Sequence, residues 1–162
     1  MKNIVILYHA KCADGFGSAY AAWKKFGADA DYIPVRDRRT PPPGLTGKDV
    51  YILDFSYSPE VFSTIERNAK SLTVIDHHKG VEKEVRALKN HVFDNNHSGA
   101  VLSWKYFHLG TPVPKLLAYV EDGDLWKFAL PSSKEVAASV HNHGFDFEVW
   151  DRLATNSIQG KV

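Results

Sequence analysis

Residues 72–78 of the chain read LTVIDHH, a short branched apolar run followed at once by one aspartate and two histidines. Similar apolar runs occur at residues 4–7 (IVIL) and 50–53 (VYIL). Continuous runs of this length, unlike alternating ones, are typical of strands buried on both faces of a parallel sheet. The three runs therefore predict the centre of an open α/β sheet.

The segments between these runs have the apolar spacing of helices. We predict helices over 17–26 and 58–69, with Pro59 well placed at the first helical position, and weaker strands over 30–35 and 91–93. The second half predicts mainly helices, over 99–109, 114–122, 133–141 and 146–154. The expected fold is α/β, with an open, mainly parallel sheet flanked by helices and a helix-rich second half.

Composition and charge exclude several classes of protein. The chain has 162 residues, of which 44% are hydrophobic, and 20 basic side chains against 19 acidic ones, which suits one globular domain over residues 1–162. A formal net charge of +1 argues against a broad basic face for long duplex nucleic acid. A single cysteine excludes an intrachain disulfide, and no apolar run reaches membrane length. We therefore expect a cytoplasmic protein with no membrane partner.

Polar residues follow directly after each of the three predicted strands. His9 follows the first run, Asp54 the second, and residues 76–78 the third, while Asp14 lies in the loop after His9. One aspartate at a strand end is typical of a turn or a helix cap. Several at the carboxyl edge of one parallel sheet, where open α/β folds bind ligands, predict a metal site. Carboxylates and imidazoles without thiolate partners are typical of a site for Mn²⁺, Mg²⁺ or Fe²⁺, with Zn²⁺ as an alternative, and less typical of a structural zinc site.

The same residues resemble the signature motifs of the DHH phosphoesterase superfamily. That group includes RecJ-type exonucleases, hydrolases of small oligonucleotides, cyclic-dinucleotide phosphodiesterases and type II inorganic pyrophosphatases. Residues 9–15 (HAKCADG) resemble its first motif, Asp54 its second and residues 76–78 its third. Residues 98–100 (SGA) resemble the helix opening that follows, and residues 121–126 (EDGDLW) resemble the fourth, acidic motif. The motifs occur in family order and span most of the chain.

The resemblance implies a Rossmann-like DHH domain and a divalent-metal-dependent phosphoesterase. Such an enzyme hydrolyses phosphodiester bonds by a metal-bound hydroxide, with two ions expected. Mn²⁺ is the expected ion, and Mg²⁺ or another divalent ion is the alternative. Asp54 is the expected bridging ligand, because a carboxylate spans two cations better than a neutral imidazole. The other implied metal ligands are His9, Asp14 and His77, together with Asp122, which aligns better with the fourth motif, or else Asp124.

Three further positions of these motifs have implied roles. Cys12 stands where the first motif often has an aspartate, and it is a thiolate ligand, a support for a ligand or a small buried side chain. Asp76 is expected to orient or anchor its neighbours. His78 is expected to contact the phosphate or to protonate the leaving oxygen.

Substrate-binding candidates lie at a helix start and in a basic loop. Ser98 and the amide of Gly99 are placed to receive a phosphate oxygen, and ordinary helix capping is the alternative. His97 is a further candidate beside them. Arg36 and Arg38 follow the strand predicted at 30–35, although a solvated charged loop is the commoner origin of such a run.

The expected partner is a small phosphorylated substrate or a short oligonucleotide. The alternatives are a phosphomonoesterase or pyrophosphatase acting on a small molecule, and a non-catalytic binding domain of the same fold. Members of the superfamily usually carry a second, C-terminal substrate-binding domain with a glycine- and histidine-rich motif. No such motif occurs before Val162, so we expect that domain to be absent or truncated. A homodimer is left open by the sequence.

Overall fold

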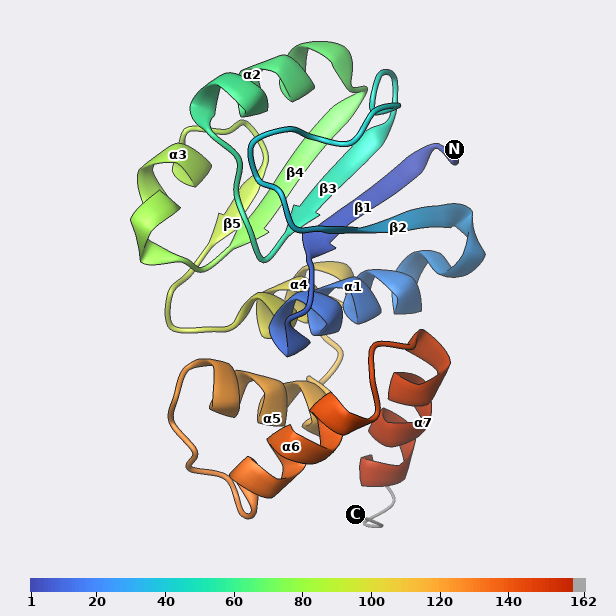
Figure 1. Cartoon of the computed structure of the whole chain (residues 1–162), viewed down its shortest axis with the longest axis vertical. Helices are drawn as coiled ribbons and strands as arrows, with labels where there is room; N and C mark the ends of the chain where they lie inside the picture. Colours follow the sequence, from blue (N-terminus) through green and yellow to red (C-terminus); the bar gives the residue numbers. More distant parts are fainter. Residues whose placement is uncertain (159–162) are drawn as a thin grey trace.

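Five parallel strands form a single sheet in the computed structural model of the chain, which describes residues 1–158. Their order across the sheet is β2-β1-β3-β4-β5 (Figure 1). All four pairings between neighbouring strands are parallel, which confirms the expected sheet. The strands are β1 (Ile4–His9), β2 (Ala30–Val35), β3 (Asp49–Leu53), β4 (Ser71–Asp76) and β5 (His91–Phe93).

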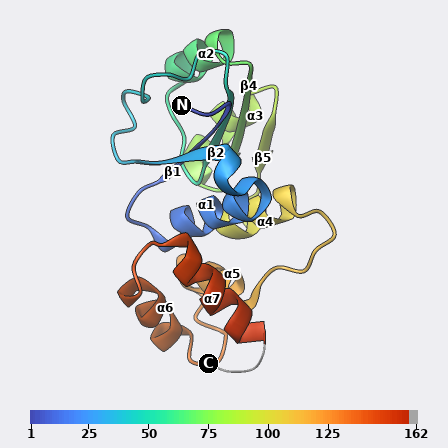
Figure 2. The same cartoon turned by 90° about the vertical axis from the view of Figure 1, so that its right-hand side faces the viewer.

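Helices cover both faces of the sheet and add a further layer on one side (Figures 1 and 2). One face is covered by α2 (Pro59–Asn68) and α3 (Glu82–Arg86), and the other by α1 (Ala13–Phe26) and α4 (Gly99–Phe107). The predicted helix-rich second half is confirmed, whereas the short α3 was not predicted. The remaining helices are α5 (Lys115–Asp124), α6 (Ser133–Asn142) and α7 (Phe147–Ile158), with 3-10 turns at Gly27–Asp29 and Lys79–Val81.

The sheet is buried on both faces, which explains its continuous apolar runs. Val5 and Leu7 of β1 belong to the core under α2 and α3, while Ile6 packs into the core under α1 and α4. All three side chains are fully buried. A strand that contacts two cores has no polar face, so its sequence does not alternate.

The carboxyl ends of the central strands lie level with one another. Tyr8 of β1 pairs with Leu53 of β3, and Leu53 pairs in turn with Ile75 of β4. The chain leaves β1 through α1 toward β2, and later returns to β3 on the other side of β1, so the strand order reverses between β1 and β3. Open α/β sheets bind ligands outside the strand ends at such a reversal. His9 and Asp54 flank this point.

Glycines allow α1 to lie close to the sheet edge and to α4. A β-carbon at Gly15 would lie 2.1 Å from the carbonyl oxygen of His9, and one at Gly17 would lie 2.8 Å from the β-carbon of Ala100. The first turn of α1 is therefore held against the end of β1, which brings Asp14 to the same edge.

Every helix within residues 1–158 is too short or too polar to cross a membrane. The expected cytoplasmic location stays a prediction.

Candidate metal centre

The structure brings the polar residues of the strand ends together. His9 ends β1, Asp54 follows β3, and Asp76 ends β4, at the level set by the strand register. Two helices complete the cluster, because Asp14 lies in the first turn of α1 and Asp124 is the last residue of α5. We call this group of side chains the metal cluster; its members are His9, Cys12, Asp14, Asp54, Asp76, His77, His78 and Asp124.

Asp54 lies at the centre of the metal cluster. Its Oδ2 is 3.3 Å from Nδ1 of His9 and 3.9 Å from Sγ of Cys12. Its Oδ1 is 3.1 Å from Nε2 of His77. The side chain is 1% exposed, and the backbone has a φ of +65°, a left-handed conformation that costs free energy in a residue other than glycine. The two oxygens of one buried carboxylate thus face two different sets of donor atoms.

His77 gathers the second set of donors. Its Nε2 is 3.2 Å from Oδ2 of Asp14 and 3.6 Å from Oδ2 of Asp124. Three groups of ligand atoms that lie within 4.8 Å of one another occur among the described residues. One group consists of Asp54, Asp76, His77 and His78, and the other two are triads that share no residue with each other. The first triad is His9, Cys12 and Asp54, and the second triad is Asp14, His77 and Asp124.

Burial and neighbouring charges shift the pKa of each residue of the second triad. Burial and the negative charge of Asp54 raise the pKa of Asp14 to about 6. Burial and the negative charge of Asp14 raise the pKa of Asp124 to about 6. Burial alone would lower the pKa of His77, but hydrogen bonds with Asp14 and Asp54 outweigh it and raise that pKa to about 10. A buried carboxylate and a partly exposed one that both face the same imidazole favour a cation between them.

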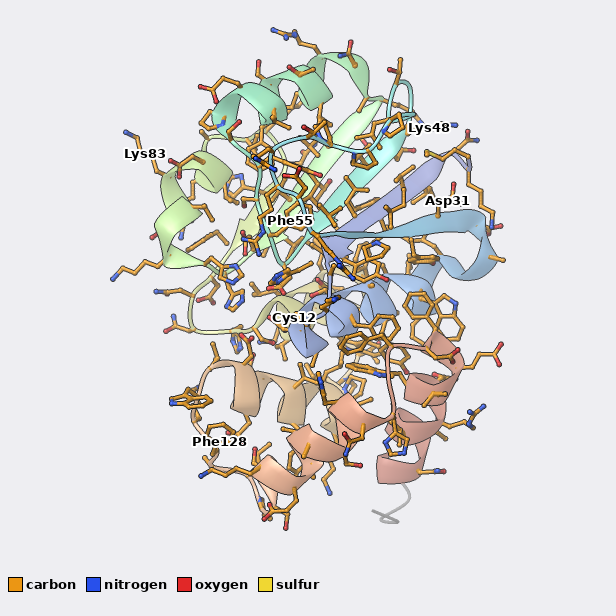
Figure 3. All side chains as sticks on the ribbon, viewed as in Figure 1. Cys12, Asp31, Lys48, Phe55, Lys83 and Phe128 are labelled. Carbon is orange, nitrogen blue, oxygen red and sulfur yellow. The ribbon has the colours of Figure 1, made fainter. Side chains whose placement is uncertain are left out.

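Cys12 lies at the edge of the metal cluster. It is the N-cap residue of α1, and Figure 3 shows it near the carboxyl ends of the strands. Burial and the negative charge of Asp54 raise the pKa of its thiol to about 11. Without a cation the sulfur is therefore a protonated, weak donor at neutral pH.

Asp76 anchors the two histidines that follow it. Its fully buried carboxylate accepts hydrogen bonds from the hydroxyl of Ser56 at 2.7 Å and from the amide of His77 at 2.8 Å. It also accepts from Nδ1 of His78 at 2.6 Å. Burial would raise the pKa of Asp76, but the bonds from His78 and Ser56 outweigh it and hold that pKa below its usual range. The hydrogen bond between His78 and Asp76 also raises the pKa of His78, whose side chain is 44% exposed.

Comparisons with known proteins place the fold but name no activity. No family model matches the sequence. The chain is 31% identical over 175 aligned positions to an uncharacterized protein of Acanthamoeba polyphaga mimivirus, which covers 98% of this chain and 42% of that protein. It thus spans less than half the length of this viral relative. A crystal structure of an uncharacterized protein from Helicobacter pylori superposes with a TM-score of 0.61 at 12% identity, over 80% of this chain and 45% of that one. This likeness shows the fold alone.

The sequence favoured Asp122 over Asp124 as the metal ligand, and the structure reverses that preference. Asp124 faces His77, whereas the carboxylate of Asp122 accepts hydrogen bonds from the amides of Ala129 and Leu130 at 3.0 and 3.1 Å and from the hydroxyl of Ser133. Two positions two residues apart on a helix point in nearly opposite directions. Asp122 therefore holds the loop after α5, and Asp124 is the residue that reaches the metal cluster.

The predicted phosphate contact at the start of α4 is not what the structure shows. The amides of Gly99 and Ala100 both donate to the carboxylate of Asp14, each at 2.8 Å. The hydroxyl of Ser98 accepts from the amide of Val101 at 3.2 Å, and Ser98 is fully buried. The capping alternative therefore holds, because a buried carboxylate of the protein takes the amides that a phosphate would need.

Of the other predicted substrate residues, Arg38 reaches the metal cluster, whereas Arg36 and His97 lie elsewhere. The guanidinium of Arg38 lies 2.9 Å from Nε2 of His9 and over the ring of Phe55, so it reaches the metal cluster. Arg36 lines a different cavity, together with Tyr8 and Lys11. His97 lies between Glu121, 3.1 Å from its Nδ1, and Lys105, 3.1 Å from its Nε2.

Two supporting residues were missed by sequence reasoning. Ser56 anchors Asp76 from the loop after β3, and no spacing in the sequence marks it. Glu121 accepts hydrogen bonds from the amide of Ser98 at 2.9 Å and contacts His97, so it joins α5 to the start of α4. Glu121 opens the acidic motif at 121–126, and its charge beside two aspartates was the available signal.

Proposed function

We propose that the protein is a divalent-metal-dependent phosphoesterase of the DHH superfamily. Its proposed substrates are phosphodiester bonds of short oligonucleotides or nucleotide-like molecules. The observation that supports this most is the position of Asp54, whose two carboxylate oxygens face the first and the second triad separately. A carboxylate in this position could help to hold two divalent ions, which would activate a water for attack on phosphorus.

The donor set fits Mn²⁺ or Mg²⁺. The first triad offers an imidazole, a carboxylate and a thiol, and the second triad offers an imidazole and two carboxylates. The carboxylates suit Mn²⁺ and Mg²⁺, whereas the thiolate of Cys12 would suit a softer ion such as Zn²⁺. Divalent ions bound here would polarise phosphoryl oxygens and lower the pKa of a bound water.

The chain's own residues would move the proton and hold the phosphate. Nδ1 of His78 donates to Asp76, which leaves Nε2 to exchange a proton with the substrate. The bond to Asp76 raises the pKa of His78, so the ring stays protonated to a higher pH than a free imidazole does. A group that protonates a leaving oxygen needs this proton. The exposed guanidinium of Arg38, beside His9, would hold a non-bridging phosphate oxygen by charge-assisted hydrogen bonds.

Hydrolysis assays with and without Mn²⁺ test the proposal. Bis-p-nitrophenyl phosphate, p-nitrophenyl phosphate, pyrophosphate and a short RNA would each be offered, with a chelator arm for each. We expect turnover of the diester and of the RNA that needs Mn²⁺ and falls by more than about a hundredfold in Asp54→Asn. Glu66→Gln, which changes an exposed carboxylate on α2, is the matched control and should keep full activity.

The pattern of substrates decides between the alternatives. A preference for p-nitrophenyl phosphate or for pyrophosphate would replace the diesterase proposal with the phosphomonoesterase or pyrophosphatase alternative. If the folded protein binds Mn²⁺ by calorimetry but turns over none of the four compounds, the enzymatic proposal is wrong and the non-catalytic binding domain takes its place.

A further inference from the structure

An open cavity lies beside the metal cluster on the other face of β1. Its volume is about 520 Å³, within the usual range of small-molecule sites. Successive residues of a strand point to opposite faces, so Tyr8 lines this cavity while His9 contacts Asp54 in the metal cluster. The other walls come from the segment after His9, the end of β2 and Phe145, in the link that rises from α6 to α7 beside α1 (Figure 1).

The cavity has an aromatic wall that is held in place from behind. Phe145 stacks on Phe16 at a ring-centre distance of 5.3 Å, and Phe16 stacks on Phe147 at 4.7 Å. Tyr8 contacts the edge of Phe16 at 6.0 Å. Phe145 is 37% exposed, so it is the end of this stack that faces solvent. A planar aromatic ligand in the cavity would extend a stack that already exists.

Two cationic side chains lie at the same cavity. Lys11 and Arg36 both line it, both are exposed, and neither makes an ion pair with a described residue. None of the described residues that line the cavity is acidic, and Asp37, which follows Arg36, pairs with Arg39 at 3.0 Å. The cavity therefore offers positive charge without a carboxylate of the protein to neutralise it.

We propose that this cavity binds a nucleotide, with the base against Phe145 and Tyr8 and its phosphate at Lys11 and Arg36. A flat aromatic group joined to an anion is the chemistry that these four side chains match together. The proposal rests on the proposed function for its role in catalysis. It makes the cavity a specificity site that holds the nucleotide next to the phosphodiester at the metal cluster.

Binding of adenosine 5′-monophosphate to the metal-free protein tests the cavity directly. Chelator is present throughout, because the carboxylates of the metal cluster repel a phosphate when no cation is bound. Adenosine and inorganic phosphate are titrated in parallel by calorimetry. We expect the monophosphate to bind more tightly than either part alone. Phe145→Leu should weaken it by about fivefold to a hundredfold, in line with the loss of one base-stacking contact.

Matched variants separate this cavity from a general surface effect. Arg36→Gln should weaken the monophosphate but leave adenosine unchanged. Trp126→Leu removes an aromatic side chain that is 81% exposed elsewhere, and Arg67→Gln removes an exposed cation of α2, on the other face of the sheet, so neither should change the affinity. Should Phe145→Leu lose its cooperative melting transition, the comparison of Arg36→Gln with Arg67→Gln still decides the result.

Each failure points to a different part of the interpretation. No binding of the monophosphate, or equal affinity in Phe145→Leu, Arg36→Gln and the unchanged protein, overturns the cavity proposal. Inorganic phosphate that binds as tightly as the monophosphate also overturns it, in favour of a simple basic patch. If Mn²⁺-dependent hydrolysis persists with an unaltered KM in Phe145→Leu, the phosphoesterase stands without this site. If the monophosphate binds through Phe145 and nothing is hydrolysed, the proposed function fails and the site stands.

Discussion

A β-carbon added at Gly99 would lie 2.8 Å from the β-carbon of Asp54 and 2.8 Å from its Oδ1. The first residue of α4 therefore touches the centre of the metal cluster, and it does so without a side chain. Since the side chain of Asp54 is 1% exposed, there is little room for it to move aside. The position of the Asp54 carboxylate thus depends on the packing of α4, which begins at Gly99, 45 residues further along the chain.

Replacement of Gly99 by alanine is expected to disturb Asp54 directly. We expect Gly99→Ala to lower the free energy of unfolding by about 1–3 kcal/mol through overpacking, and to weaken Mn²⁺ binding. Urea unfolding and calorimetry with Mn²⁺ measure the two effects. Gly123→Ala is the control, because its β-carbon would meet its nearest neighbour at 3.9 Å and it sits within α5. That variant should be as stable as the parent or more stable by up to about 1 kcal/mol.

Replacement of the two aspartates of α5 should affect different properties, Mn²⁺ affinity for Asp124 and stability for Asp122. Asp124→Asn removes an oxygen donor of the second triad, so we expect at least a tenfold loss of Mn²⁺ affinity with a nearly unchanged melting temperature. Asp122→Asn breaks contacts to Ala129, Leu130 and Ser133, so we expect about 1–3 kcal/mol less stability with Mn²⁺ affinity retained. A loss of Mn²⁺ affinity in Asp122→Asn and not in Asp124→Asn would contradict the assignment.

The metal-free protein should lose stability as the pH rises above neutrality. Folding raises the pKa of His77 from 6.5 to about 10, through its contacts with Asp14 and Asp54. The stabilisation from the protonated ring is fully present below pH 6.5 and is lost as the pH rises toward 10. In chelator we therefore expect a lower melting temperature at pH 9 than at pH 7, and a smaller change in His77→Gln. A melting temperature that rises over this interval in the parent protein would be inconsistent with the raised pKa.

Mn²⁺ should reverse part of this trend, since it needs the neutral imidazole of His77. The increase in melting temperature caused by Mn²⁺ is expected to grow between pH 6.5 and pH 8 as the proton becomes easier to displace. Calorimetry in two buffers of different ionisation enthalpy should detect proton release on Mn²⁺ binding. An increase that is independent of pH would argue against His77 as a ligand.

Arg38 should affect substrate more than metal. Its guanidinium lies at the edge of the metal cluster but belongs to neither triad. We expect Arg38→Gln to raise the KM for bis-p-nitrophenyl phosphate by about tenfold, a loss of one charge-assisted contact, with Mn²⁺ affinity within about twofold. Arg39→Gln removes the neighbouring cation, which is paired with Asp37, and should leave both constants unchanged. Equal effects of the two variants would mean that only the general charge of the loop matters.

Much of the fold follows from local sequence. The apolar runs at 4–7, 50–53 and 72–75 are central strands of one parallel sheet, because only a strand covered on both faces has no polar side. The same local pattern locates the strand ends, and the sheet register then brings His9, Asp54 and Asp76 to one edge. These relationships depend on residues that are neighbours along the chain or on adjacent strands, so they could be predicted.

Contacts between distant elements could not be predicted in this way. Which aspartate of α5 meets His77 depends on how that helix is rotated against α1 and α4, and the 121–126 motif alone does not fix that rotation. The sequence predicts that the amides at the start of α4 have no partner within the helix. In the structure, α1 packs on α4 and the amides of Gly99 and Ala100 donate to Asp14. Likewise the link before α7 brings Phe145 onto Phe16, and so closes one wall of the cavity beside Tyr8.

The sequence by itself therefore determined the parallel sheet and the polar residues at its carboxyl edge, because hydrophobic periodicity and chain order are local properties. The tertiary structure alone decided that Asp124 and not Asp122 completes the second triad, and that Asp14 caps α4. The physical reason is that side chains from separate helices meet only where burial of apolar surface fixes the helices against one another.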